Sequence, residues 1–159
     1  MFTSTVVLRR RIVLIDIENI AGGGIRMAQQ VHDAQCALTE VAALDFDVDH
    51  IVVSSGRASA EVAGFAWSGQ RRFVFRSGVD GADLELLAIL ETEHIADRFT
   101  DVLLVSGDAI FTDAVAALGA QGVTVTVASR PESLSRRLRM AASHTIELDY
   151  ESDSVLEAA

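Results

Sequence analysis

Short apolar runs alternate along the chain with longer stretches in which apolar residues recur every three or four positions. The short runs are typical of buried β-strands, and the longer pattern is typical of amphipathic helices. The pattern therefore predicts strands at residues 11–16, 49–55, 71–76, 101–106 and 123–129, and a sixth, edge strand at 144–148. It predicts helices at residues 25–44, 59–67, 81–99, 109–122 and 131–143.

Alternating strands and helices predict an α/β fold. Because the strands are almost continuously apolar, we expect a three-layer α/β/α, Rossmann-like arrangement with a central, mainly parallel sheet of five or six strands. The 159 residues suffice for one hydrophobic core, so we assign a single domain to residues 1–148 and expect residues 149–159 to form an acidic, flexible tail. In such sheets ligands bind beyond the carboxyl ends of the strands. The residues that follow each strand therefore matter most for function.

Acidic and amide side chains gather at these strand ends. Asp16 ends the first strand, Asn19 comes three residues later, and Asp108 follows the fourth strand. Asp83, with Asp80 as a competitor, opens the helix before the fourth strand. Carboxylates brought together in this way repel one another unless a hard cation such as Mg²⁺ or Mn²⁺ neutralises them. The pattern predicts a metal site that polarises a phosphodiester and lowers the pKa of an attacking water.

Helix capping is the alternative explanation for several of these acids. Asp108 precedes a predicted helix and is a favoured N-cap residue, while Asp83 completes an imperfect capping box. Asp113 lies in the first turn of its helix, where a carboxylate suits the helix dipole. Capping explains Asp16 poorly, because no helix is predicted directly after it. Glu18 alternates with Asp16 along the chain and is interpreted as a bystander.

The basic residues exclude several classes of enzyme. All thirteen are arginine, and without lysine the chain cannot form a P-loop, a Schiff-base site or a receiver-type phosphorylation domain. A phosphatase of the aspartyl-phosphate type is a disfavoured alternative, because it needs Asp-x-Asp and a lysine, whereas this chain has Asp16-x-Glu18 and no lysine. A net charge of −10 argues against a protein that coats nucleic acid non-specifically. Arginine nevertheless binds phosphate well. Arg57 and Arg130 follow predicted strands and Arg76 ends one, and we expect all three to contact nucleic-acid phosphates.

The single cysteine, Cys36, excludes a disulfide framework and a cysteine-based zinc site. Its apolar surroundings predict a small buried residue. One free thiol and the absence of a recognisable signal peptide favour a cytoplasmic location. No apolar stretch is long enough for a membrane span.

Three segments, "LIDIEN", "GADLELL" and "LLVSGDAIF", together resemble the NYN domain, a branch of the PIN-like nuclease superfamily. The resemblance extends over residues 11–140. Asp16 and Asn19 match the family's first motif, and Asp83 matches the second. The third motif is matched by Ser106, Gly107, Asp108 and Phe111. The resemblance implies a PIN fold.

The activity that this resemblance implies is a Mg²⁺- or Mn²⁺-dependent ribonuclease acting on RNA. By the resemblance, Asp16, Asp83 and Asp108 hold the metal, and Asn19 positions a ligand or the scissile phosphate. By analogy with acidic PIN-like domains that pair, a homodimer is also expected.

One position departs from the family. The second aspartate of the third motif falls on Ile110 here, so one carboxylate is missing. Asp113 lies one helical turn further on the same face and is expected to give auxiliary support. The alternative hypothesis is a catalytically weakened PIN-like module that binds RNA or a protein partner.

Overall fold

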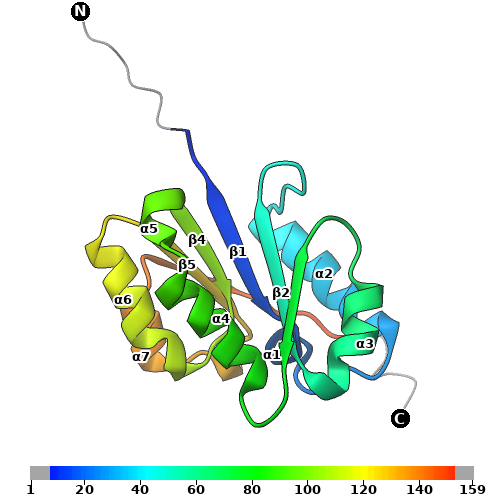
Figure 1. The fold of residues 1–159 in the computed structure, drawn as a ribbon. Coiled ribbons are helices and arrows are strands. Elements are labelled where there is room, and N and C mark those ends of the chain that lie inside the picture. The colour runs from blue at the N-terminus through cyan, green and yellow to red at the C-terminus, as the bar shows by residue number, and fades with distance from the viewer. Residues whose placement is uncertain (1–7, 153–159) are drawn as a thin grey trace, which may run out of the picture.

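A computed structural model describes residues 8–152 of the chain. These residues form a parallel sheet in the order β3-β2-β1-β4-β5-β6 (Figure 1). The strands are β1 (Arg11–Asp16), β2 (His50–Gly56), β3 (Arg72–Arg76), β4 (Asp101–Val105), β5 (Thr124–Ser129) and β6 (His144–Glu147). The chain crosses from β3 back to β4 on the far side of β1. The carboxyl ends of β1 and β4 therefore form the switch point at which such sheets bind ligands.

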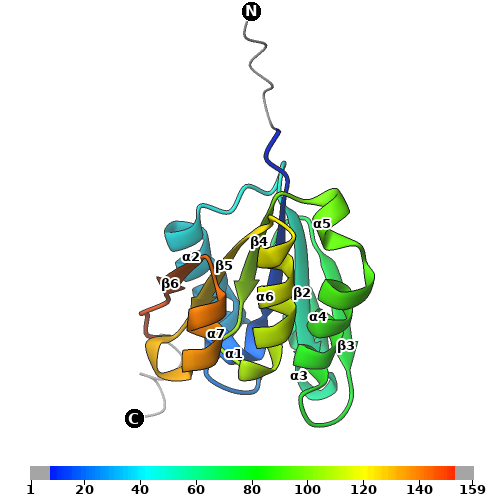
Figure 2. The same cartoon turned by 90° about the vertical axis from the view of Figure 1, so that its left-hand side faces the viewer.

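Helices cover both faces of the sheet, as the two views in Figures 1 and 2 show. One face carries α1 (Ile17–Ala21), α2 (Ala28–Ala42) and α3 (Arg57–Ala66). The other carries α4 (Gly81–Thr92), α5 (Ile95–Arg98), α6 (Thr112–Ala120) and α7 (Arg136–Ala141). Two short 3₁₀ turns, η1 (Ala109–Phe111) and η2 (Pro131–Ser133), precede α6 and α7. The structure confirms the three-layer α/β/α fold.

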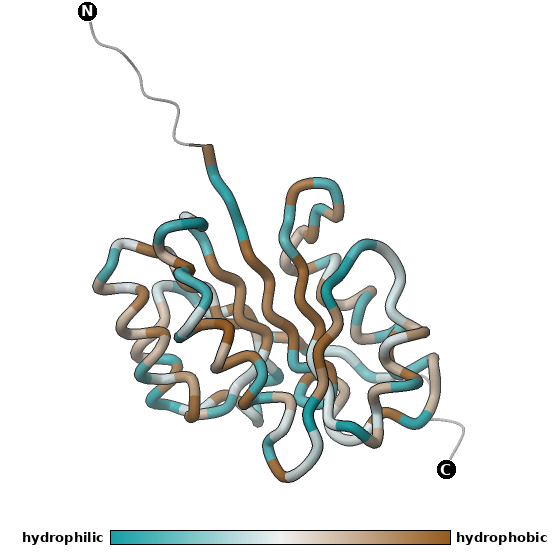
Figure 3. The backbone as a smooth tube through the Cα atoms, in the orientation of Figure 1, coloured by the Kyte–Doolittle hydropathy of each residue, from teal (hydrophilic) through white to brown (hydrophobic). Residues whose placement is uncertain are grey.

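Strand β1 lies at the centre of two hydrophobic cores. Ile12 and Leu14 point into the core under α4–α7, whereas Val13 and Ile15 point into the core under α1–α3. All four side chains are fully buried. The apolar colour of the central strands continues to their carboxyl ends in Figure 3. Asp16, the next residue, therefore enters a desolvated environment.

The strand predictions are confirmed, but several helices are shorter than predicted. The helix predicted at 81–99 is divided because His94 has a left-handed backbone with φ of 52°. The helix predicted at 109–122 begins as a 3₁₀ turn, and the one predicted at 131–143 is reduced to η2 and α7. Hydrophobic spacing located these segments correctly but did not reveal where the backbone hydrogen bonds break.

The prediction that no helix directly follows Asp16 is wrong. The five-residue helix α1 begins at Ile17, with Ile17 and Ile20 buried three positions apart. Gly22 ends this helix with a left-handed φ of 81°, a conformation that glycine adopts at little cost. A helix this short is too brief to produce a visible helical period in the sequence.

Two further features differ from expectation. Cys36 is exposed on α2, so the prediction of a buried thiol is wrong. After β6 the chain packs back onto the domain: the Tyr150 hydroxyl donates to the Ile20 carbonyl at 2.8 Å, and Ser152 donates to Asp33 at 2.6 Å. The rest of the predicted tail lies outside the described residues. No helix in the described part of the chain is long and apolar enough to cross a membrane.

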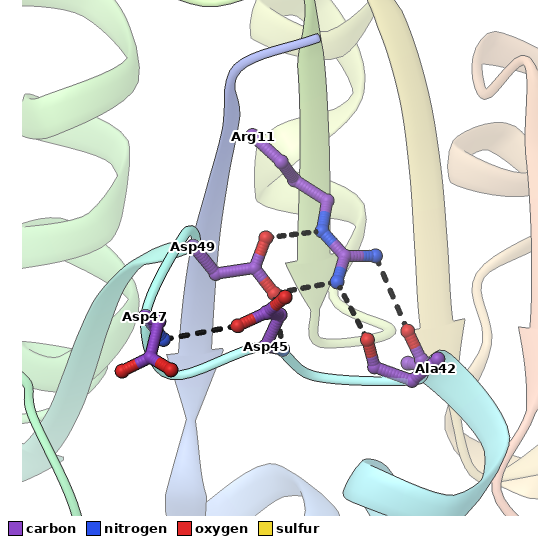
Figure 4. A network of polar contacts seen from close by, with 6 residues as sticks. Arg11, Ala42, Asp45, Asp47 and Asp49 are labelled. Atoms are coloured by element: carbon purple, nitrogen blue, oxygen red, sulfur yellow. Dashed lines mark hydrogen bonds and ion pairs between the residues drawn. The ribbon is translucent and has the colours of Figure 1, made fainter.

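At the amino edge of the sheet, Arg11 connects β1 to the segment before β2 (Figure 4). Its guanidinium donates to both oxygens of Asp49, at 2.8 and 2.6 Å, and to the carbonyls of Ala42 and Ala43. The backbone N–H of Asp45 also donates to Asp49, at 2.8 Å. The side chain of Asp49 is only 4% exposed, so this buried charge is paired and hydrogen-bonded.

Candidate functional site

Three elements bring the predicted acidic residues to one edge of the sheet. Asp16 is the last residue of β1 and is level with Ser54 of β2. The Ser54 hydroxyl donates to the Ala82 carbonyl at 2.9 Å, which fixes the start of α4 over the end of β2. This contact places Asp83 beside Asp16.

The carboxyls of Asp16 and Asp83 lie within hydrogen-bonding reach of each other. They are only 5% and 8% exposed. Burial, the hydrogen bond to Asp16 and the neighbouring negative charges together raise the pKa of Asp83 to about 8, and burial is the largest of these causes. Burial also raises the pKa of Asp16. At neutral pH the pair therefore keeps a proton, because two buried carboxylates at this distance resist ionising together.

One oxygen of this pair has no partner. Asp83 Oδ1 is buried, and no other described residue hydrogen-bonds to it. Buried polar atoms are nearly always satisfied, and an orphaned carboxylate oxygen costs free energy that the rest of the fold must offset. The orphaned oxygen is the feature of the site that calls for an external ligand.

Asp16 is also the N-cap of α1. Its Oδ1 accepts the backbone N–H of Asn19 at 3.1 Å. Asp16 therefore caps α1 and also belongs to the acidic cluster, the name we use for Asp16, Asp83 and Asp108. The side chain of Asn19 reaches across to the loop after β4, where its Oδ1 accepts the N–H of Gly107 at 3.2 Å. Asn19 therefore holds the loops that follow β1 and β4 in a fixed relation.

Asp108 follows directly in the loop after β4 and is half-buried. Its Oδ1 caps η1 by accepting the N–H of Ile110 at 2.9 Å. Its charge contributes to the raised pKa of Asp83, which places the two carboxylates near each other. Like Asp16, Asp108 combines a capping role with a position in the cluster.

Two of the sequence-predicted acids are less central. Asp80 is exposed at the start of α4, with a left-handed φ of 58°, and acts on Asp83 only through its charge. Asp113 is exposed in the first turn of α6 and is not among the charges that raise the pKa of Asp83. Ile110 is partly buried and packs against the core under α4–α7.

The three predicted phosphate contacts differ in availability. Arg57 is exposed and borders a shallow pocket that also includes Glu18 and Ser77. Arg76 forms an ion pair with Glu85 at 2.7 Å. Arg130 already makes hydrogen bonds and a ring contact within the protein.

Arg130 connects three separate parts of the chain. Its Nε donates to the Ile20 carbonyl at 2.7 Å, and its Nη1 donates to the Tyr150 carbonyl at 3.3 Å. Its guanidinium also lies 4.5 Å from the centre of the Tyr150 ring. With a side chain only 18% exposed, Arg130 stabilises the end of α1 and the segment after β6.

Glu18 is the residue of the site that the sequence interpretation underrated. Because α1 begins at Ile17, the strand-like alternation that predicted a bystander does not apply. Glu18 is half-buried, and its Oε1 accepts the N–H of Gly56 at 3.1 Å, where α3 begins. The position of Glu18 could have been predicted only by knowing that a helix begins at Ile17.

A comparison with protein families bears on this arrangement. The NYN domain matches residues 10–149. This chain belongs to the NYN domain family. The match places it in the PIN-like nuclease superfamily, as the sequence motifs predict. A comparison with curated proteins gives no match.

Among solved structures, this NYN domain is similar to a protein of unknown function from Vibrio parahaemolyticus. The TM-score is 0.56 at 17% sequence identity, over 94% of this chain and 97% of the other. At that identity the likeness supports the fold alone. It agrees with the parallel, three-layer architecture described above.

The acids of this NYN domain have the chemistry of a divalent-metal site without a complete, preassembled shell. Among residues 8–152, no group of three or more His, Cys, Asp or Glu side chains is arranged to hold a metal ion. Mg²⁺, however, is commonly bound by one or two carboxylates and keeps several waters. The Asp16–Asp83 pair, with one orphaned oxygen, fits a hard cation of this kind.

Proposed function

We propose that this NYN domain is a metal-dependent ribonuclease that hydrolyses phosphodiester bonds of RNA. The observation that carries the proposal is the buried Asp16–Asp83 pair with its unpartnered Oδ1, at the edge of the sheet where parallel α/β folds bind ligands. Of the hydrolytic cofactors, Mg²⁺ or Mn²⁺ matches an all-oxygen donor set.

Each residue has a separate part in this proposal. Asp16 and Asp83 hold the cation in place of their shared proton, and Asp108 adds negative charge beside them. When bound, the cation lowers the pKa of a water and stabilises charge on the phosphate. Asn19 fixes the Asp108 loop relative to Asp16 through Gly107. Asp113 gives auxiliary support, and Arg57, which is exposed, contacts the substrate phosphates. Arg76 and Arg130 contact the substrate while they keep their bonds to Glu85 and to the Ile20 carbonyl.

Asp16→Asn is the decisive test, because asparagine is as good an N-cap as aspartate. The variant keeps the hydrogen bond that starts α1 and removes only the charge. We expect Mn²⁺-dependent cleavage of single-stranded and structured RNA to fall by about a thousandfold or more, since a metal ligand is lost. Cleavage is followed on gels with end-labelled RNA.

Asp47→Asn is the matched control, because Asp47 is an exposed acid at the opposite edge of the sheet. It should cleave RNA at the wild-type rate and unfold at the same temperature. Asp16→Asn protein that is folded and still cleaves RNA at the wild-type rate would contradict the assignment.

A second function, RNA or partner binding without catalysis, is favoured by Ile110. The family carboxylate at this position is replaced by a partly buried, apolar side chain that packs against the core. Titration calorimetry with Mn²⁺ separates the two functions. The ribonuclease requires metal binding that Asp16→Asn weakens, whereas the binding module requires none.

A further inference from the structure

We propose that the exposed arginines of α7 bind the phosphate backbone of RNA beside the acidic cluster. We call Arg136, Arg137 and Arg139 the α7 arginine face. This inference rests on the proposed ribonuclease function and identifies the surface that holds the substrate. It concerns residues other than Arg57, Arg76 and Arg130.

Helix α7 is attached directly to the loop that carries Asp108. The N–H of Ser135, the residue before α7, donates to the Gly107 carbonyl at 2.8 Å. The fit is tight, because a Cβ added at Gly107 would lie 2.2 Å from the Ser133 carbonyl oxygen. Since Asp108 and Arg136 each follow one end of that hydrogen bond, their Cα atoms are at most about 11 Å apart. Helix α7 therefore begins close to the loop that carries Asp108.

The α7 arginine face is available for an external anion. All three residues are exposed, and within the described part of the chain no ion pair involves them. Of the acids on the adjoining elements, Glu132 pairs weakly with Arg130 at 3.9 Å, and Asp113 is exposed on α6. Arg76 and Arg130, in contrast, already have partners inside the protein. At this edge of the sheet, the guanidinium groups of the α7 arginine face are therefore among those without an ion-pair partner in the described part of the chain.

The scaffold under these arginines is fixed. Leu138 is fully buried between them, and the N–H of Arg139 donates to the Ser135 carbonyl at 3.0 Å. Helix α7 packs against α6 and η1, as the front of Figure 2 shows for α6. Met140, 77% exposed, lies one helical turn from Arg136 and adds an apolar contact beside the charges. Anchored guanidinium groups with an adjacent apolar side chain suit a nucleotide chain, in which phosphates and bases alternate.

Charge explains why the domain needs such a surface. With a formal charge of −10 and several carboxylates at the site, the protein as a whole repels RNA. Local cations at the rim of the site offset that repulsion and set the path of the backbone. An anionic lipid surface offers similar charges, but the hydrogen bond between Ser135 and Gly107 ties these arginines to the acidic loop and favours RNA.

The test compares two triple variants that remove the same charge from opposite edges of the sheet. One replaces Arg136, Arg137 and Arg139 by glutamine, and the control replaces Arg9, Arg10 and Arg71, which are exposed at the amino edge. Both are made in the Asp16→Asn background, so that RNA stays intact. Binding of fluorescein-labelled single-stranded RNA is measured by anisotropy over a range of salt concentrations, and circular dichroism confirms folding.

We expect the α7 variant to bind about tenfold or more weakly, with the slope of log Kd against log salt reduced by about 2, because three phosphate contacts are lost. The control should retain wild-type slope and affinity. Replacing the same three α7 arginines by lysine should restore most of the binding, since the charge returns. Equal losses in the two glutamine variants would overturn the inference, as would loss of binding to anionic vesicles without loss of binding to RNA.

The same variants separate this inference from the proposed function. If the wild-type domain cleaves RNA and the α7 variant with Asp16 intact has an unchanged kcat/KM, the α7 arginine face is wrong and the ribonuclease stands. If the wild-type domain binds RNA through α7 but never cleaves it, the ribonuclease is wrong and the α7 surface stands.

Discussion

Two buried aspartates lie at opposite edges of the same sheet and have opposite surroundings. Asp49, at the amino edge, accepts two hydrogen bonds from the Arg11 guanidinium and one from a backbone N–H (Figure 4). Asp83, at the carboxyl edge, meets another carboxyl and keeps one oxygen unpartnered. Both are almost inaccessible to solvent. Burial alone therefore does not identify a functional acid; the identity of its partner does.

The largest effect on stability should come from removing the ion pair between Asp49 and Arg11 at the amino edge of the sheet. Asp49→Asn removes the charge that pairs with Arg11 and leaves the partly buried guanidinium without its hydrogen-bonded counter-ion. We expect the free energy of unfolding to fall by about 2–3 kcal/mol. Urea denaturation followed by circular dichroism measures the loss. Asp47→Asn, which removes an exposed charge from the same loop, should change stability little, and an equal loss there would contradict this explanation.

The corresponding substitution at the carboxyl edge, Asp83→Asn, should raise the free energy of unfolding instead of lowering it. Asp83→Asn removes a carboxyl whose ionisation the folded protein resists, so we expect the variant to be more stable than wild type at pH 8 by about 1–2 kcal/mol. The same urea titration measures it. Lower stability of Asp83→Asn at this pH would show that the carboxyl is satisfied as Asp49 is.

The pH dependence of that difference follows from the pKa of Asp83. Its value is about 8 in the folded protein and 3.8 when unperturbed. Between these values the folded state keeps a proton that the unfolded state releases, so wild-type stability declines as pH rises. The advantage of Asp83→Asn should therefore be absent at the acid end of this window and grow toward pH 8.

Proton release on metal binding also distinguishes the wild type from Asp83→Asn, and it reports on the Asp16–Asp83 pair specifically. A cation that binds the Asp16–Asp83 pair must displace the shared proton, so we expect release of up to about one proton per Mn²⁺ at pH 7. Calorimetry in two buffers with different ionisation enthalpies measures the released protons. Asp83→Asn should release none. Mn²⁺ binding that is equally strong in wild type and in Asp83→Asn would place the metal elsewhere.

The smallest effect is expected at Glu18, whose surroundings are intermediate between those of Asp49 and Asp83. It is half-buried and accepts one backbone hydrogen bond, from Gly56. Glu18→Gln keeps an acceptor for that bond, so we expect stability to change by less than about 0.5 kcal/mol. Glu18→Ala, which removes the acceptor, should cost about 1 kcal/mol. Thermal unfolding of the two variants tests whether the bond or the charge matters.

Sequence patterns predicted much of the site because of how parallel sheets are built. Strand ends at the switch point converge, and this places Asp16 near Asp108 without any knowledge of the loops. The sequence placed Asp83 and Asp80 at the start of the same helix but did not show which of them lies beside Asp16. Only the position of α4 over β2 shows that Asp83 faces Asp16, while Asp80 stays exposed.

The arginines were harder to interpret, because a position after a strand does not reveal what a long side chain contacts. Arg76 ends β3 and Arg130 follows β5, but both have partners within the protein. The arginines of α7 come later in the chain and gain their position from the contact between Ser135 and Gly107. Such contacts between distant segments leave no periodic trace in the sequence.

The sequence by itself determined the α/β class, the strand positions and the set of acids at the carboxyl edge, because these depend on local hydrophobic period and on the direction of the chain. The tertiary structure alone decided which acids are paired, which oxygen is orphaned and which arginines remain free. The physical reason is that pairing, burial and pKa depend on distances between residues far apart in the sequence. The sequence does not distinguish the surroundings of Asp49 from those of Asp83, and only the folded chain gives one an arginine and the other a second carboxyl.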